Sequence, residues 1–216
     1  VPPTAAGEPV SADRALRLSV VFGCVRLLAD SVSTLPIATY RIGERDPIPT
    51  PPLLARPSAD FPEFSDWAWA VMASLLLRGN AWGLITDRAG PGLLPAQVDL
   101  LDPDQVGVSN ESGRWVVRVA GEEVDRSELW HVRAFPWPGK LEGLSPVAYA
   151  RESIGLGIAA EKYGARFFGD SAIPSGYLYS DQRMDDAKLK QVQAQWEASG
   201  RGRRGTAVLS QMKYQT

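Results

Sequence analysis

A single histidine and two groups of aspartates are the residues of this 216-residue chain that could carry acid–base or metal chemistry. His131 lies between Trp130 and Val132, in a segment whose alternation is typical of a strand. An imidazole can transfer protons near neutral pH, but a catalytic one usually works with a nucleophile or a carboxylate. Because no convincing cysteine or serine partner accompanies it, a structural role for His131 is favoured over catalysis.

The aspartates fall into two groups, and carboxylates at short spacing can hold a divalent cation. Neither group has the spacing of an EF-hand loop. The first is better explained as a turn at a strand end, and the second as an acidic helix start that the helix dipole favours. No metal site and no cofactor are therefore expected. The groups are Asp99, Asp102 and Asp104, and Asp181, Asp185 and Asp186.

Two glycine-containing motifs resemble catalytic signatures only superficially. The run Gly143-Leu144-Ser145-Pro146 contains the serine of a nucleophile elbow, but it lacks the second glycine and places a proline after the serine. Ser145 and Pro146 instead fit the cap and the first position of a helix. The run 202–206 is glycine-rich but lacks the lysine of a P-loop, so ATP hydrolysis is not predicted.

The strongest electrostatic feature is a basic loop that follows the last predicted helix. Its three arginines, together with two lysines of that helix, could contact phosphate groups. Three arginines neutralise few phosphates, so a solvated loop or a charged contact between subunits is favoured over a nucleic-acid site. The residues are Arg201, Arg203, Arg204, Lys188 and Lys190.

Composition limits the class of protein. With 44% hydrophobic and 22% charged residues the chain can bury a core, and its net charge of −2 argues against a surface that grips phosphate throughout. No apolar run approaches the roughly 18 residues that span a bilayer, so no membrane partner is expected. The single cysteine, Cys24, excludes an intrachain disulfide and is predicted to be a small buried residue within a helix.

The elements that position these residues are predicted to meet at a corner over residues 75–82. Apolar residues recur at helical spacing up to Leu75, and the next apolar run is typical of a short buried strand. Gly79 can be the left-handed residue that closes the helix. Arg78 complements the carbonyl end of the helix dipole, and Asn80 can bond local backbone groups. The corner is thus predicted to be architectural.

The N-terminal quarter is predicted to contain a flexible start, a helix, a strand and a connector. Residues 1–10 form the flexible segment, and Ser11 should cap a helix that buries an apolar seam. An edge strand at 35–41 and a proline-rich connector at 47–57 should follow, and five prolines leave the connector unable to form a helix. The seam comprises Ala15, Leu18, Phe22, Val25, Ala29 and Val32.

The remaining pattern predicts a β-rich middle over residues 82–133 between helices. Asp60 should cap the second helix, and later helices should begin at Ser145 and near Asp185. The helix after Ser145 should bury Phe168. Because helices and strands are segregated, we predict an α+β fold in which several helices pack on mostly antiparallel strands.

In their order and spacing, several segments resemble the portal protein family of tailed bacteriophages, the head-to-tail connectors. The resemblance covers nearly the whole chain, although each segment alone has little specificity. Where the family usually has an Asn-Gly pair after two phenylalanines, this chain has Gly169-Asp170-Ser171. The matching segments are 15–26, Leu35-Pro36, 76–81, 129–133, 143–146, 166–169 and 174–176.

The resemblance implies a portal wing-like domain over residues 11–216, with the stem, clip and crown of the family expected to be absent. It implies a non-enzymatic subunit of a dodecameric ring at one capsid vertex of the virion, assembled in the host cytoplasm. Double-stranded DNA would pass through the channel during packaging and ejection. The expected partners are further copies of the chain, the terminase motor, the capsid and head–tail connector proteins.

Two other classes remain open from the residues alone. A soluble hydrolase would gather the acidic clusters and His131 in one concave pocket. An aromatic-rich binding module would expose several of the seven tryptophans in one patch, although Trp67 and Trp82 are predicted to lie in the core.

Overall fold

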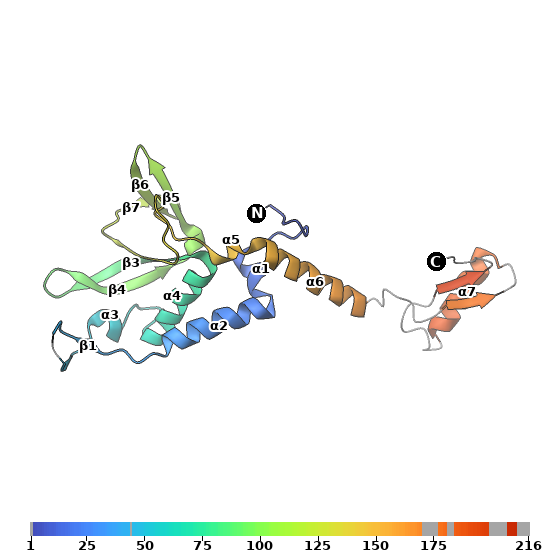
Figure 1. The fold of residues 1–216 in the computed structure, drawn as a ribbon, viewed down its shortest axis with the longest axis horizontal. Helices are drawn as coiled ribbons and strands as arrows, with labels where there is room; N and C mark the ends of the chain where they lie inside the picture. Colours follow the sequence, from blue (N-terminus) through green and yellow to red (C-terminus); the bar gives the residue numbers. More distant parts are fainter. Residues whose placement is uncertain (1, 44, 170–176, 181–183, 199–206, 211–216) are drawn as a thin grey trace. The chain divides into compact units, whose positions relative to one another are not determined.

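The computed structural model describes residues 2–43, 45–169, 177–180, 184–198 and 207–210 (Figure 1). The chain divides into two compact units, Val1–Leu156 and Gly157–Thr216, and each is described by itself. The sequence-based division into a flexible segment 1–10 and one domain over 11–216 stays a prediction. No described helix has the length and apolar character that crossing a bilayer requires.

The first unit is organised around helix α4 (Phe64–Arg78). This helix contacts both α2 (Ser19–Ser33) and strand β3 (Asn80–Ala89), and Figure 1 shows it between them. Three short helices complete the unit, and a longer helix begins in it. These are α1 (Ala12–Leu16), α3 (Pro52–Ala55), α5 (Pro146–Tyr149) and α6 (Arg151–Gly169).

Two three-stranded antiparallel sheets form the β-rich middle. Strand β3 lies between β4 (Leu94–Leu101) and β8 (Leu129–Arg133). After a short 3₁₀ turn at Pro103–Gln105, the second sheet has the order β5 (Val106–Glu111), β6 (Arg114–Val119) and β7 (Glu122–Val124). A small antiparallel pair joins β1 (Thr39–Tyr40) to β2 (Pro47–Ile48). The predicted α+β class is confirmed.

Beyond the part of α6 that belongs to it, the described part of the second unit contains one helix and a parallel strand pair. Strands β9 (Tyr177–Ser180) and β10 (Ala207–Ser210) pair in parallel, and α7 (Asp186–Ala198) contacts β10. The Asp185 carboxylate accepts a hydrogen bond from the Lys188 backbone N–H at 2.8 Å, so the predicted cap of this helix is confirmed.

The core of the first unit lies between α4 and the β3 sheet. Trp67 and Val71 of α4 meet Ala81 of β3 and Val98 of β4 in one buried cluster. The Trp67 indole N–H donates to the Val98 carbonyl at 3.0 Å, which satisfies a polar group that burial would otherwise penalise. Trp67 and Trp82 are both buried, as the sequence predicts.

The first predicted helix is interrupted at Leu18. Ser11 caps α1 as predicted, its hydroxyl accepting from the Arg14 backbone N–H at 3.2 Å. Leu18 then takes an extended conformation, with φ −72° and ψ 122°, and precedes α2. The Leu18 side chain is buried at this break. Helical periodicity in the sequence did not indicate that the helix would be interrupted here.

The orientation of α2 also corrects the predicted seam. Val25 and Ala29 are buried, but Phe22 and Val32 are 53% and 40% exposed. Cys24, expected to be buried, is exposed. The helix therefore turns a narrower stripe inward than the sequence pattern indicates.

The segment before α4 differs from the prediction in three places. The edge strand expected at 35–41 is reduced to β1. The connector contains the short helix α3, because Pro52 occupies its first turn, where a missing N–H is tolerated. Asp60 does not cap α4. Instead the Ser58 hydroxyl accepts from the Phe61 N–H at 2.9 Å, and the helix starts later, without a side-chain cap.

The predicted helix after Ser145 is split. Ser145 does cap α5, but Ala150 leaves the helical region and α6 follows as a separate helix. Phe168, predicted to be buried, is 83% exposed. The only buried residues of α6 are Ile154 and Gly155, near its start, and helical periodicity does not indicate where along a helix its covering ends.

Replacing Val98 by alanine is expected to lower the free energy of unfolding by about 2 kcal/mol, because it removes two methyl groups from a fully buried site. Val20→Ala is the matched control, since Val20 is 75% exposed and should change stability by less than about 0.5 kcal/mol. Urea denaturation measures both. Equal effects would contradict the assignment of the core.

Candidate functional site

The corner at the end of α4 is built on a left-handed glycine. Gly79 has φ 78°, and its N–H donates to the Leu75 carbonyl at 2.9 Å, which closes the helix. Its carbonyl accepts from the Ala134 N–H at 2.9 Å, just beyond β8. The predicted helix end is confirmed, and it is tied directly to the neighbouring strand.

A second glycine, Gly143, lies against the backbone of Gly79. A Cβ on Gly79 would meet the backbone of Leu144 and Ser145, the Ser145 nitrogen lying only 2.8 Å away. A Cβ on Gly143 would overlap backbone atoms of Gly79 and Ala134. Both positions are therefore restricted to glycine by the approach of one backbone to another.

Asn80 joins the two backbones. Its amide nitrogen donates to the Gly143 carbonyl at 3.2 Å, and its side-chain oxygen accepts from the Gly143 N–H at 2.7 Å. The amide nitrogen also lies 3.3 Å from the Arg78 carbonyl. Asn80 is buried, so these bonds replace the water that its amide gives up. Local backbone bonding was predicted, but the bridge to Gly143 was not.

His131 completes the network from strand β8. Its Nε2 lies 3.0 Å from the Asn80 side-chain oxygen, and its ring stacks on Trp82 with centroids 3.4 Å apart. Burial, assisted by the positive charges of Arg133 and Arg126, lowers the pKa of His131 from 6.5 to about 4. The imidazole is therefore neutral at pH 7 and can donate from Nε2 to the amide oxygen.

The Ser145 hydroxyl both donates to and accepts from backbone groups. Its hydroxyl donates to the Leu77 carbonyl at 2.9 Å and accepts from the Ala148 N–H at 3.2 Å. Pro146 occupies the first turn of α5, as predicted. The serine thus links the end of one helix to the start of another, and this geometry is that of a cap and not of a nucleophile.

Arg78 extends the corner toward the turn after β4. Its guanidinium donates to both carboxylate oxygens of Asp104, with Nε 2.8 Å from Oδ1. This hydrogen bond lowers the pKa of Asp104. Asp13 lies 3.9 Å from the same guanidinium. The sequence indicated only a favourable helix-end charge here, because the partners come from distant segments.

The other predicted chemical groups do not converge. Among the residues that the structure describes, no three histidine, cysteine, aspartate or glutamate side chains form a group that could hold a metal ion. Asp102 accepts from the Asp104 N–H, as expected of a turn. Lys188 and Lys190 are exposed on α7, whereas Asp181, Arg201, Arg203 and Arg204 lie outside the described residues.

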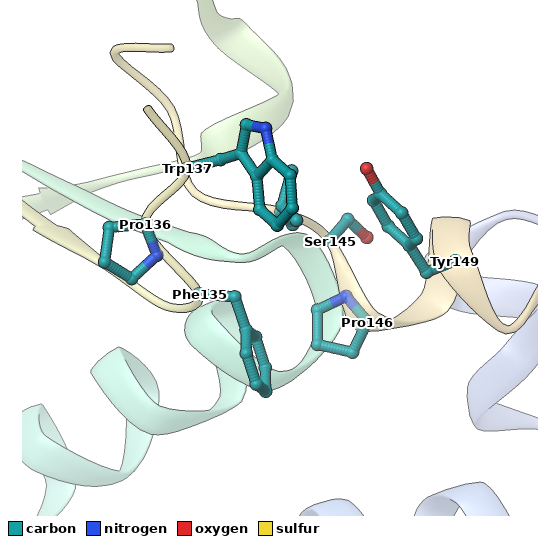
Figure 2. Close-up of a pocket in the computed structure, with 7 residues that line it drawn as sticks. Phe135, Pro136, Trp137, Ser145, Pro146 and Tyr149 are labelled. Atoms are coloured by element: carbon teal, nitrogen blue, oxygen red, sulfur yellow. The ribbon is translucent and has the colours of Figure 1, made fainter. Parts of the chain in front are cut away.

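An apolar pocket of about 410 Å³ lies beside the corner. Phe135, Pro136 and Trp137 line it from the loop after β8, and Pro146 and Tyr149 line it from α5 (Figure 2). Phe135 has φ 45°, an uncommon conformation for a non-glycine residue. Sequence reasoning missed this pocket, although the aromatic and proline run at 135–138 is a signal for it.

Known proteins match this chain over nearly its whole length. The family model described as phage portal protein matches residues 19–216. A probable portal protein of Streptomyces phage phiC31 is 35% identical over 216 aligned residues, covering 92% of this chain and 47% of that protein. The chain belongs to the phage portal protein family.

Solved structures agree with this portal assignment at the level of the fold. An HK97-family phage portal protein from Corynebacterium diphtheriae is 18% identical, with a TM-score of 0.57 over 94% of this chain and 63% of that one. The neck of a native gene transfer agent particle, computed with C12 symmetry, gives 20% identity and a TM-score of 0.54 over 90% and 57%. This portal chain thus spans about half the length of its curated relative.

Three segments that carry the portal resemblance meet at the corner. Residues 76–81 end α4 and begin β3, residues 129–133 form β8, and residues 143–146 lead into α5. Asn80, His131 and Gly143 join them through hydrogen bonds. The motif that identifies the portal chain is thus one contact network in space.

Gly79→Ala is expected to lower the free energy of unfolding by more than about 3 kcal/mol or to prevent folding, because positive φ and a backbone clash act together. Gly90→Ala is the matched control. Gly90 has φ 73° with open space around its Cα, so it should lose only about 1 kcal/mol. Thermal unfolding and soluble yield measure the pair, and equal losses would refute the role of the contact.

The low pKa of His131 predicts a pH dependence of stability. Between pH 6.5 and about 4 the unfolded chain binds a proton that the folded chain does not. The stabilisation is complete above pH 6.5 and is lost as the pH falls toward 4. The loss should be on the order of 1 kcal/mol, since the ring is only half buried.

His131→Gln tests this dependence, because it keeps an amide donor for Asn80 but cannot titrate. Urea denaturation at pH 7 and pH 4.5 should show a smaller loss on acidification for the variant than for the natural chain. The same loss in both would assign the pH effect to other groups.

Proposed function

We propose that this chain is part of the subunit of a portal ring at a capsid vertex of the virion. The ring forms the channel through which double-stranded DNA is packaged and ejected, and it docks the terminase motor and head–tail connector proteins. Family membership over residues 19–216 supports this proposal. The role is structural and non-enzymatic, and the ring assembles in the host cytoplasm.

The observation that carries the ring contact is an uncovered apolar stripe on α2. Val20, Cys24, Leu27 and Leu28 recur at the spacing of one helix face. Val20 and Leu27 are 75% and 66% exposed, while the opposite face of the helix packs on α4. An exposed apolar stripe of this kind on a single subunit is typical of a surface that a partner protein covers.

Ring closure requires two different surfaces on each subunit, because a head-to-tail contact repeats in one direction around the axis. The α2 stripe supplies one such surface. Gene transfer agent necks of similar fold are stated with C6 and with C12 symmetry, which supports a ring, and the C12 neck supports a dodecamer of this chain. The net charge of −2 suits a channel wall, since tight phosphate binding would oppose sliding of DNA.

No specific observation favours a hydrolase. His131 Nε2 lies against the side-chain oxygen of Asn80, Asp104 is paired with Arg78, and Asp102 accepts from turn backbone, so these groups do not converge on one site. Of the exposed aromatic residues, Phe135, Trp137 and Tyr149 line the pocket beside α5. Phe22, Tyr40 and Trp69 lie on other elements of the same unit, so the exposed aromatic residues do not form one patch.

Leu27→Asp in the portal protein that carries this chain is expected to reduce the fraction of rings by about tenfold or more, because a buried leucine contributes about 2 kcal/mol at each contact. Leu93→Asp is the matched control, with 64% exposure on the β3–β4 hairpin. Sedimentation velocity and electron microscopy measure the rings, and circular dichroism checks folding. Normal rings from the Leu27 variant would show that the α2 stripe is not a contact between subunits.

A further inference from the structure

The pocket beside the corner has the chemistry of a proline-binding groove. No charged side chain lines it, and aromatic rings and prolines form most of its walls, together with Leu144 and Ser145. Trp137 and Tyr149 are 59% and 70% exposed, so their rings are available to a ligand. Aromatic-lined grooves of this kind bind polyproline II segments, whose conformation costs little entropy on binding.

The same unit displays a segment of matching chemistry. The run Pro49-Thr50-Pro51-Pro52 joins β2 to α3, and Pro51 has φ −59° and ψ 151°, which is polyproline II geometry. Pro49, Thr50 and Pro52 are exposed. The Pro51 and Pro52 carbonyls accept hydrogen bonds from backbone N–H groups at α3, so the run offers the pocket chiefly its exposed proline rings.

The segment and the pocket belong to opposite ends of α4. Leu53, at the end of the proline run, packs against the core cluster that contains Trp67, in the first turn of the helix. The pocket adjoins the other end, where Leu144 lies against Gly79. Figure 1 shows α3 and α5 correspondingly far apart, and a helix of 15 residues spans about 22 Å. The two surfaces cannot meet within one copy.

We propose that the pocket binds the run Pro49–Pro52 of a neighbouring copy of this chain. The contact joins two different surfaces, so it repeats head to tail, which is the type of contact that closes a ring. It rests on the proposed ring function and names a second contact besides the α2 stripe. Its proline rings pack on the faces of Trp137 and Tyr149.

Cross-linking between two single-cysteine variants tests the contact. Thr50→Cys and Ala148→Cys are each made in the Cys24→Ala background of the portal protein that carries this chain, which keeps the α2 stripe apolar, and a short bismaleimide is added. Ala148 is exposed on α5, next to Tyr149 in sequence, and does not line the pocket. Cross-linked dimers are expected only when the two variants are mixed. The double variant should give a ladder of larger species.

Trp137→Ala should lower the yield of mixed dimers by about tenfold, since an aromatic contact contributes about 1 kcal/mol beyond its buried area. Pro49→Ala with Pro51→Ala should lower it as well, whereas Pro91→Ala, an exposed proline in the β3–β4 turn, should not. Thermal unfolding identifies any variant that fails to fold, and the conservative Trp137→Phe should retain most of the yield.

The outcomes separate this contact from the ring itself. Rings in electron microscopy without mixed dimers would overturn the proline contact and leave the proposed function intact. Cross-links within Thr50→Cys alone would also overturn it, because they indicate a two-fold contact. A synthetic Pro47–Leu54 peptide could change the tryptophan fluorescence of the natural chain but not that of the Trp137→Ala variant. That result with no mixed dimers would assign the pocket to a different proline-rich protein.

Discussion

The close approach of Gly79 to Gly143 is the contact on which the rest of the first unit depends. Two backbones that touch without side chains between them fix the distance between the end of α4 and the start of α5. Asn80 then acts as an extra peptide group, exchanging two hydrogen bonds with Gly143. Because β3 begins at Asn80, the direction of the central strand is set by the same residues that end the helix.

Local signals in the sequence predicted the parts of this corner but not their meeting. Gly79 and Ser145 were predictable because a left-handed helix end and a helix cap are decided within a few residues. The bridge from Asn80 to Gly143 joins residues 63 positions apart, so no local pattern indicates it. Leu18 and Asp60 show the converse. There a plausible local signal was overridden by burial of a leucine and by the turn that Ser58 forms.

The candidate surfaces were harder to predict than the fold. The seam of the first helix was read from apolar spacing, yet α2 carries apolar residues on more than one side, and only packing on α4 decides which are buried. The aromatic pocket forms when the loop after β8 folds beside α5, and its residues are separated in sequence. Their apolar character was visible in the sequence, but their convergence required the tertiary structure.

Each of these candidate surfaces packs on helix α4 or lies near one of its ends. The α2 stripe lies on a helix packed along α4, the proline run lies near its first turns, and the pocket lies near its last residue. A closed ring of identical subunits needs a constant angle between the two surfaces that meet, since a small error accumulates at every step around the axis. A corner in which backbone contacts backbone has less freedom to vary this angle than one packed through flexible side chains. In the proposed ring, the two glycines thus connect the local geometry of one helix end to the requirement for closure.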